Sequence, residues 1–243
     1  MWDISSVHKI NNAHLGHLES GIKPDKVSSL SLMWNAYQKG GPDYRLLQKG
    51  VGLKIAFIIY DEMTALDFIG VYDPLTRLKT MGFMPDLNWE VCATAKEVSD
   101  VTGLRFTATK VLNPLGTYDM VVVPGGFGSR KLVSNKKFIE WLRTASSCQL
   151  KVSVCTGSVL LGAAGFLQGK KATTHRTAFD ELRQYATVVD QRIVDEGDVI
   201  TARGVSSSID LGLYICEKLA GREVKEEIRR QMDYYRPSHE PAE

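Results

Sequence analysis

The sequence predicts a three-layer α/β sandwich, in which helices cover both faces of a doubly wound and mostly parallel central sheet. Two continuous apolar runs, Leu53–Tyr60 and Met120–Val123, have the length of strands that are buried on both faces, as in parallel sheets. A third run, at Lys151–Val154, is rich in β-formers and leads through a cysteine into a helix of small residues. Strand patterns alternate with helix patterns along the chain, which favours this layered class of fold.

The other elements follow from hydrophobic periodicity and from residues that begin or end helices. Pro74 is expected to kink the first helix or to mark a fresh start. Ser134 is a candidate cap for a later helix, and Gly197 a candidate hairpin turn. In chain order we expect a helix to about Thr80, a strand Trp89–Ala95, a hairpin of Val98–Thr102 with Leu104–Val111, a helix after Ser134, a helix Ser158–Ala164, a strand Ala172–Thr174, a helix Thr177–Tyr185, a hairpin of Arg192–Glu196 with Asp198–Ala202, and helices Ser208–Ala220 and Glu223–Tyr235.

Composition indicates an ordinary globular protein. The chain has 243 residues, of which 44% are hydrophobic and 24% charged, with a formal net charge of +2. This small charge and the absence of a basic tract give no support for nucleic-acid binding. The apolar runs are too short to cross a membrane, and the N-terminus lacks the apolar segment of a secretory signal. Four cysteines without metal-ligand spacing favour a reducing, cytoplasmic setting.

We divide the chain into a partly helical N-terminal extension (1–50), the α/β domain (51–236) and a polar tail (237–243). The segment Val27–Gln38 carries apolar residues at helical spacing, which predicts a helix that docks on the main domain or on a partner. His14 and His17 could share a helical face, but a metal site would need further ligands, and we predict none.

The stretch KVSVCTGSVLLGAAG, residues 151–165, carries the strongest functional signal. A strand that turns sharply into a helix leaves the side chain of the turn residue, here Cys155, above the sheet edge. The first N–H groups of the helix and its dipole favour an anion, so we expect a depressed pKa for this thiol. The alternative is a buried structural cysteine, which is the usual fate of a free cysteine. The corner position beside glycine favours the reactive thiol.

A reactive thiol needs an acid or base nearby. Glu62 and Asp67 both follow the first strand, and Glu62 comes early enough in the loop to be solvated. Asp67 lies among apolar residues, where desolvation would raise its pKa and let it donate a proton; alternatively, it only caps the next helix. His175 is the one histidine in the body of the domain. It would complete a Cys–His pair, unless it only bonds the end of the sheet.

A glycine-rich loop, Pro124–Gly128, follows the strand Met120–Val123. Glycines in this position let backbone N–H groups approach a ligand closely. We therefore expect Gly125, Gly126 and Phe127 to form an oxyanion or substrate site together with the N–H of Thr156. The loop lacks the lysine and the spacing of a phosphate-binding loop.

Four segments together resemble the ThiJ/PfpI superfamily, which is related to the class I glutamine amidotransferases and has a flavodoxin-like fold. They are IAFIIYDEMTALDFIG, VVVPGGFG, VSVCTGSVLLGAAGFLQGKKATTH and GVSSSIDLGL, and the resemblance extends over about residues 52–235. The order of these motifs is specific for the fold and for the cysteine.

Within the superfamily, the Cys-Thr-Gly elbow and the LD-x-x-G motif most resemble the isonitrile hydratase branch. Such enzymes are hydro-lyases that add water to an isocyanide and give an N-substituted formamide. The resemblance implies that Cys155 is the nucleophile and forms a thioimidate, that Asp67 is the general acid and base, and that Thr156 helps to set the site. It also implies a homodimer with a small-molecule substrate, no cofactor, and no nucleic-acid or membrane partner.

Other readings stay open. The protein could be a non-catalytic ligand-binding or cysteine redox-sensing module, or a glyoxalase- or hydrolase-like enzyme that uses Cys155 and His175. Glu62 does not align clearly with the glutamate of glyoxalase-like members, and Thr156 replaces the histidine of the peptidase-like branch. Arg176 stands where hydratase-like sequences carry an aromatic residue. AraC-like regulators share the elbow but continue into a helix-turn-helix domain, which disfavours a DNA-reading role here.

Overall fold

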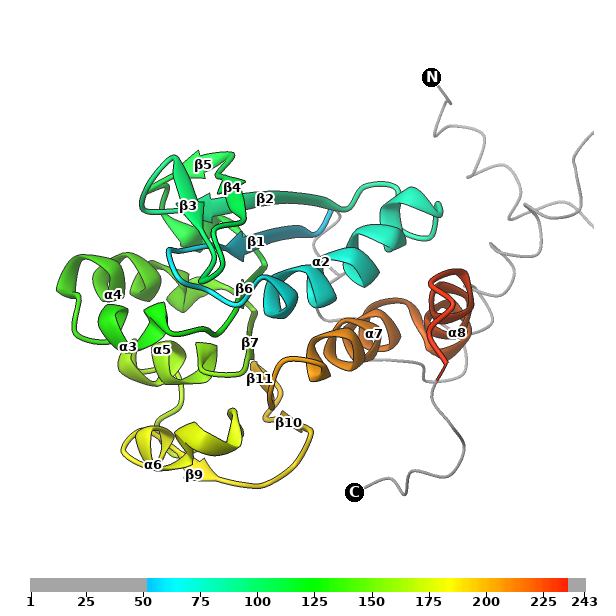
Figure 1. Ribbon diagram of the computed structural model, residues 1–243. Coiled ribbons are helices and arrows are strands. Elements are labelled where there is room, and N and C mark those ends of the chain that lie inside the picture. The colour runs from blue at the N-terminus through cyan, green and yellow to red at the C-terminus, as the bar shows by residue number, and fades with distance from the viewer. Residues whose placement is uncertain (1–51, 236–243) are drawn as a thin grey trace, which may run out of the picture.

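A seven-stranded sheet lies at the centre of the part of the chain that the computed structural model describes, residues 52–235 (Figure 1). The strand order is β10-β11-β7-β6-β1-β2-β5, and every neighbouring pair is parallel except β10 and β11. The strands are β1 (Lys54–Ile58), β2 (Asn88–Ala93), β5 (Lys110–Val111), β6 (Met120–Val123), β7 (Leu150–Val154), β10 (Ile193–Asp195) and β11 (Val199–Ala202). The predicted mostly parallel sheet is confirmed. The proposed extension, its helix and histidine pair, and the polar tail lie outside the described residues.

Helices cover both faces of this sheet, which gives the predicted three layers (Figure 1). On one face lie α2 (Ala65–Thr80), α7 (Ser207–Ala220) and α8 (Arg222–Gln231). On the other face lie α3 (Gly128–Leu132), α4 (Lys136–Arg143) and α5 (Gly157–Ala163). All residues of β6 and β7 are buried. Burial on both faces explains why β6 is apolar without alternation, whereas β7 also buries the polar side chains of Lys151 and Ser153.

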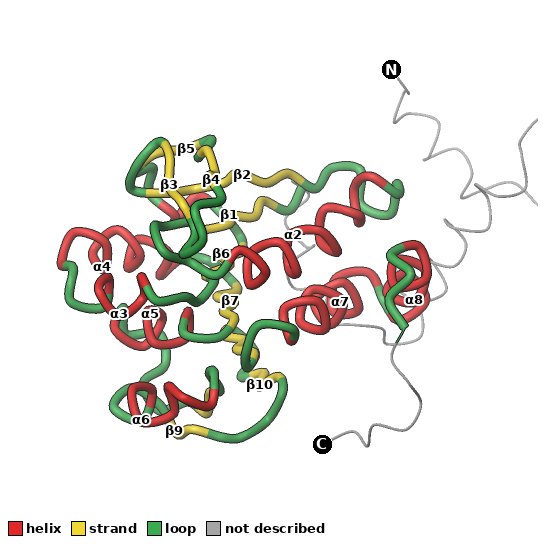
Figure 2. Tube along the Cα trace, viewed as in Figure 1, coloured by secondary structure: helices red, strands yellow, loops and turns green. Residues whose placement is uncertain are grey.

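Short elements extend beyond the three layers (Figure 2). The hairpin predicted around Gly103 forms, but it is shorter than expected, and the end of its second half joins the main sheet as β5. The predicted helix over 177–185 divides into a 3-10 turn and one short α-helix. These elements are β3 (Glu97–Ser99), β4 (Arg105–Thr107), β8 (Lys171–Ala172), β9 (Thr187–Val188), α6 (Phe179–Leu182) and the 3-10 helices η4 (Leu115–Thr117), η5 (Thr144–Ser147) and η6 (Arg176–Ala178).

Two expectations about helix boundaries are wrong. Pro74 does not mark a fresh helix start, which was one of its two expected roles, because it lies inside the single helix α2 and packs closely against α7 at Gly212. A β-carbon at Gly212 would lie 2.8 Å from the Pro74 ring, so the glycine makes room for the proline. Ser134 caps no helix. Instead α3 begins at Gly128, and the side chain of Asn135 caps α4 by accepting a hydrogen bond from the N–H of Phe138.

Candidate active site

Cys155 occupies the sharp turn between β7 and α5 that the sequence predicted. Its φ angle is 53°, in the left-handed region that non-glycine residues rarely adopt. Its N–H donates to the carbonyl oxygens of Ala202 and Arg203, and its carbonyl accepts from the hydroxyls of Ser158 and Thr174. The surrounding chain therefore holds the strained turn in place, as at a nucleophile elbow.

Asp67 lies in the first turn of α2 and is fully buried. Its Oδ2 accepts a hydrogen bond of 3.0 Å from the N–H of Gly125, so its side chain does not cap the helix. Its Oδ1 makes no well-aligned hydrogen bond within the described chain, although the Cys155 thiol interacts with the carboxyl. Burial raises the pKa of Asp67 to about 7, against the lowering effect of the Gly125 N–H and the thiol. The predicted upward shift of this pKa is confirmed.

The expected depression of the Cys155 pKa is wrong. Burial of the thiol and the negative charge of Asp67 raise its pKa to about 12. The N–H and hydroxyl of Thr156 lower the pKa of the thiol, but burial and Asp67 outweigh them. Only 6% of Cys155 is exposed, and α5 has only seven residues, so desolvation exceeds the benefit of the helix N-terminus.

Side-chain hydrogen bonds fix the backbone of the glycine loop after β6. The N–H of Gly126 donates to the hydroxyl of Thr156 at 2.9 Å, and that hydroxyl in turn donates to the Gly126 carbonyl. The Ser129 hydroxyl donates to the same carbonyl at 2.7 Å. Because Asp67 occupies the N–H of Gly125, neither glycine N–H is free to bind an oxyanion in this structure. The sequence contains no signal for Ser129, which becomes relevant only through this contact.

A pocket of about 380 Å³ gives access to the thiol. Asp67 does not line the pocket; it is bonded to Gly125, the residue before the lining residue Gly126. Phe127 stands at the pocket with 64% of its surface exposed. The lining residues are Thr64, Gly126, Phe127, Arg130, Cys155, Thr156, His175, Thr177 and Val205.

His175 and Glu62 lie differently from Asp67. His175 lines the pocket, but its Nδ1 lies 2.8 Å from the hydroxyl of Thr177, and no hydrogen bond joins it to Cys155 in residues 52–235. Its ring packs against the Gly204 backbone. Glu62 pairs with Lys131 at 2.5 Å on the surface, outside the pocket lining. The buried carboxyl, rather than the histidine or the surface glutamate, is therefore coupled to the thiol.

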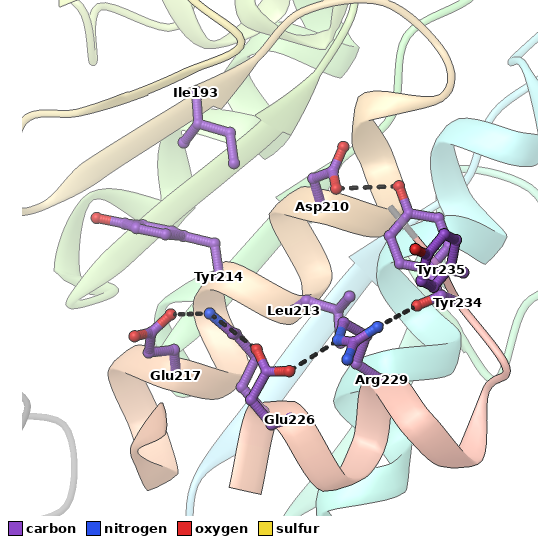
Figure 3. Close-up of a pocket in the computed structure, with 10 residues that line it drawn as sticks. Ile193, Asp210, Leu213, Tyr214, Glu217, Glu226, Arg229, Tyr234 and Tyr235 are labelled. Atoms are coloured by element: carbon purple, nitrogen blue, oxygen red, sulfur yellow. Dashed lines mark hydrogen bonds and ion pairs between the residues drawn. The ribbon is translucent and has the colours of Figure 1, made fainter. Parts of the chain in front are cut away.

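A second pocket, of about 420 Å³, lies between α7 and α8 (Figure 3). Its charged groups are paired with one another: Lys225 with Glu217 and Glu226, Arg229 with Glu226, and Asp210 with the Tyr234 hydroxyl. This arrangement joins two helices and presents no nucleophile. Residues 52–235 also contain no His, Cys, Asp and Glu cluster that could hold a metal ion, and none of their helices is long and apolar enough to cross a membrane.

A thiol at a strand-to-helix elbow, with a buried carboxyl behind it, defines a class of α/β proteins organised around one cysteine. The DJ-1/PfpI family profile matches residues 53–218, and the chain belongs to that family. It is 33% identical over 187 residues to isonitrile hydratase from Pseudomonas putida, covering 76% of this chain and 79% of that protein. It is also 30% identical over 164 residues to protein DJ-1alpha of Drosophila melanogaster, covering 66% and 73% of the two chains.

Solved structures show the same fold. A THiJ/PfpI family protein from Pseudomonas syringae superposes with a TM-score of 0.70 at 23% identity, covering 94% of this chain and 86% of that one. The predicted flavodoxin-like sandwich, and the resemblance to the ThiJ/PfpI superfamily, are thereby confirmed.

Proposed function

We propose that the protein is a cysteine-dependent hydratase of isonitrile hydratase type. The observation that carries the proposal is the buried pair of Asp67 and Cys155, in which each group perturbs the pKa of the other. With pKa values of about 7 and about 12, the pair holds one proton over a wide range above neutral pH. Similarity to the Pseudomonas putida isonitrile hydratase supports the choice of reaction.

One shared proton suits the first step of isocyanide hydration. The terminal carbon of an isocyanide, R–NC, must receive both a nucleophile and a proton. Asp67 takes the proton of the Cys155 thiol and passes it to this carbon, while the sulfur forms the C–S bond. The S–H bond is broken, C–S and C–H bonds are formed, and the product is a thioimidate, R–N=CH–S–Cys155. The sulfur attacks as a thiolate, and this minor form exists while Asp67 holds the shared proton.

Water completes the reaction on the same two residues. Asp67 accepts one proton from the water that attacks the thioimidate carbon and passes it to the nitrogen, which gives the tetrahedral adduct R–NH–CH(OH)–S–Cys155. The C–S bond of this adduct then breaks while Asp67 transfers the remaining hydroxyl proton to the sulfur, and the formamide R–NH–CHO leaves. The sum is one isocyanide and one water giving one formamide, with no oxidant or reductant consumed.

The test is formamide formation from an aryl isocyanide, followed by absorbance. The wild-type protein should turn over, and Cys155→Ala should be inactive. Cys148→Ala is the matched control, because Cys148 is also buried but lies outside the pocket lining. Absence of turnover in the wild type, or turnover by Cys155→Ala equal to that of the wild type, would refute the hydratase proposal.

The two rival functions receive less support from the site. Oxidation of a cysteine follows its thiolate character and exposure, and both are low at Cys155. A glyoxalase-like enzyme would need His175 or Glu62 beside the thiol, and neither hydrogen-bonds it in the described chain. If Cys155 formed a sulfinic acid readily and no isocyanide were consumed, the sensor function would be favoured.

We also propose that the protein works as a homodimer. Four apolar side chains, Leu66 and Ile69 on α2 and Val101 and Leu104 at the β3–β4 hairpin, are at least 41% exposed. The two segments are neighbours, because the backbone of Met63, just before α2, forms an isolated parallel β-bridge with Asp100. Sedimentation equilibrium should give twice the mass of one chain, and a Leu66→Glu, Ile69→Glu variant should give a monomer. A monomeric wild type would contradict this proposal.

A further inference from the structure

The wall of the Cys155 pocket has an uneven charge. One of its lining side chains, Arg130, carries a positive charge, and no acidic side chain lines the pocket. Arg130 belongs to α3, which follows the glycine loop, and residues of this loop line the same pocket as Cys155. A negatively charged substituent on a bound molecule would therefore meet a cation in the pocket wall. The nearby carboxylates, Glu181 bonded to Arg130 and Asp67 bonded to Gly125, do not line the pocket.

Arg130 is held in place yet keeps donors available. Its Nε and Nη2 both bind a single oxygen, Oε1 of Glu181, at 2.9 and 2.8 Å. Its guanidinium carbon lies 5.9 Å from the centre of the Phe127 ring. A guanidinium has five N–H groups, and Nη1 has no protein partner in the described part of the chain. The side chain is thus fixed by two neighbours and can still bind a second anion.

We propose that Arg130 selects substrates with an anionic substituent, so that the isocyanide this protein hydrates carries a carboxylate. The substrate class rests on the proposed hydratase function, whereas the anion preference of the pocket does not. The guanidinium fork matches the planar geometry of a carboxylate. The isocyano carbon then lies toward Cys155 and the carboxylate toward Arg130, with the Phe127 ring beside the organic part of the substrate.

The first experiment compares two substrates that differ only in charge, isocyanoacetate and its methyl ester. The wild-type kcat/KM should be higher for the acid, and Arg130→Gln should lower the ratio of acid to ester at least threefold. Arg222→Gln is the matched control, because Arg222 is exposed on α8 outside the pocket and should keep the wild-type ratio. An equal kcat/KM for acid and ester, or a ratio unaffected by Arg130→Gln, would overturn the substrate class.

The second experiment needs no hydratase activity. Cys155 is alkylated at pH 8 with iodoacetate or iodoacetamide, and the two rates, each divided by the rate with glutathione, are followed by mass spectrometry. The wild type should prefer iodoacetate, 0.5 M NaCl should weaken that preference, and Arg130→Gln should reduce it at least threefold. Glu181→Gln should increase it, because the competing carboxylate is removed.

The two experiments separate the two proposals. If no isocyanide is hydrated but the iodoacetate preference depends on Arg130, the hydratase function fails and the anion-selective pocket remains supported. If the wild type shows no iodoacetate preference over glutathione, or if Glu181→Gln leaves the preference unaltered, the role of Arg130 is refuted whatever the reaction.

Discussion

Oδ2 of Asp67 accepts the backbone N–H of Gly125 at 3.0 Å, which joins the first turn of α2 to the loop after β6. A β-carbon on Gly125 would lie 2.9 Å from this oxygen and 2.7 Å from the β-carbon of Cys155. The carboxyl, the glycine and the cysteine therefore share one small volume. The proton chemistry proposed for the site depends on this close packing, and the following predictions probe it.

The rate should depend on the protonation of Asp67. Below pH 7 the carboxyl and the thiol both hold protons, and no group can accept the thiol proton. Since the pKa of Asp67 is raised to about 7, kcat/KM should rise through pH 7 and reach a plateau above it. Asp67→Asn should lower the plateau at least about 100-fold, within the usual contribution of a general acid or base. A profile from pH 5 to 9 that is flat, or that falls with pH, would contradict this assignment.

The same substitution should stabilise the fold. The folded pKa of about 7 exceeds the ordinary value of 3.8, so the folded state binds the proton more tightly than the unfolded state. This preference is fully present below pH 4 and is lost as the pH rises to 7, so ionised Asp67 costs up to about 4 kcal/mol of stability above pH 7. Asp67→Asn should raise the urea midpoint at pH 8 and have little effect at pH 4. An equal gain at both pH values would point to packing rather than charge.

Gly125→Ala should damage the site directly. The added carbon would lie 2.5 Å from the Thr156 nitrogen, which is backbone and cannot swing aside. We expect a loss of activity of at least about 100-fold and a destabilisation of about 1–3 kcal/mol, as in other overpacked sites. Gly197→Asn is the control for activity, because open space surrounds that glycine and it does not line the Cys155 pocket; its φ of 87° disfavours any side chain, so only the rates are compared. Wild-type kinetics and unfolding in Gly125→Ala would disprove the close packing.

Thr156→Val should leave the N–H of Gly126 without its hydroxyl acceptor, at a cost of about 1–3 kcal/mol for a buried unpaired donor. The displaced loop should also reduce kcat/KM. Thr156→Ser keeps the hydroxyl and should retain most of both quantities. Ser129→Ala should have the smaller effect on stability, because the bond between Gly126 and Thr156 survives. Urea unfolding and initial rates of all three variants test this prediction. Equal losses of stability and kcat/KM in Thr156→Ser and Thr156→Val would contradict the role of the hydroxyl.

His175→Ala should change the rate of isocyanide hydration less than tenfold. The Nδ1 of His175 lies 2.8 Å from the Thr177 hydroxyl, and no hydrogen bond joins its ring to Cys155 in the described chain. Methylglyoxal consumption should be measured beside hydration. If the wild type consumed methylglyoxal and His175→Ala abolished this activity, the glyoxalase-like function would replace the hydratase.

Local patterns in the sequence were enough to predict the strands and the elbow. The continuous apolar runs that form β1 and β6 predict a parallel sheet. The turn at Cys155 follows from a strand that meets a glycine-rich helix start. The expected fresh helix start at Pro74 was wrong, because this proline lies inside α2 and packs against Gly212 of α7, far along the chain. Helix packing of this kind leaves no local trace.

The electrostatics of the site were predictable only in part. Apolar neighbours in the sequence were enough to predict the raised pKa of Asp67. The pKa of Cys155 was predicted in the wrong direction, because the depth of the thiol and its nearness to Asp67 arise only when β1, β6 and β7 come together. Ser129 and Arg130 likewise gain a role from neighbours on other elements, Thr156 and Glu181.

The burial of Cys155 also separates the folded chain from the unfolded one in its behaviour toward ordinary electrophiles. In an unfolded chain this cysteine would titrate near its usual pKa of about 8.5 and react with any alkylating agent or peroxide it met. In the folded chain the same sulfur is mostly protonated at neutral pH, because burial and Asp67 raise its pKa. Folding thus slows the reaction of this thiol with common oxidants and alkylating agents, and leaves Asp67 as the group that can accept its proton during a reaction.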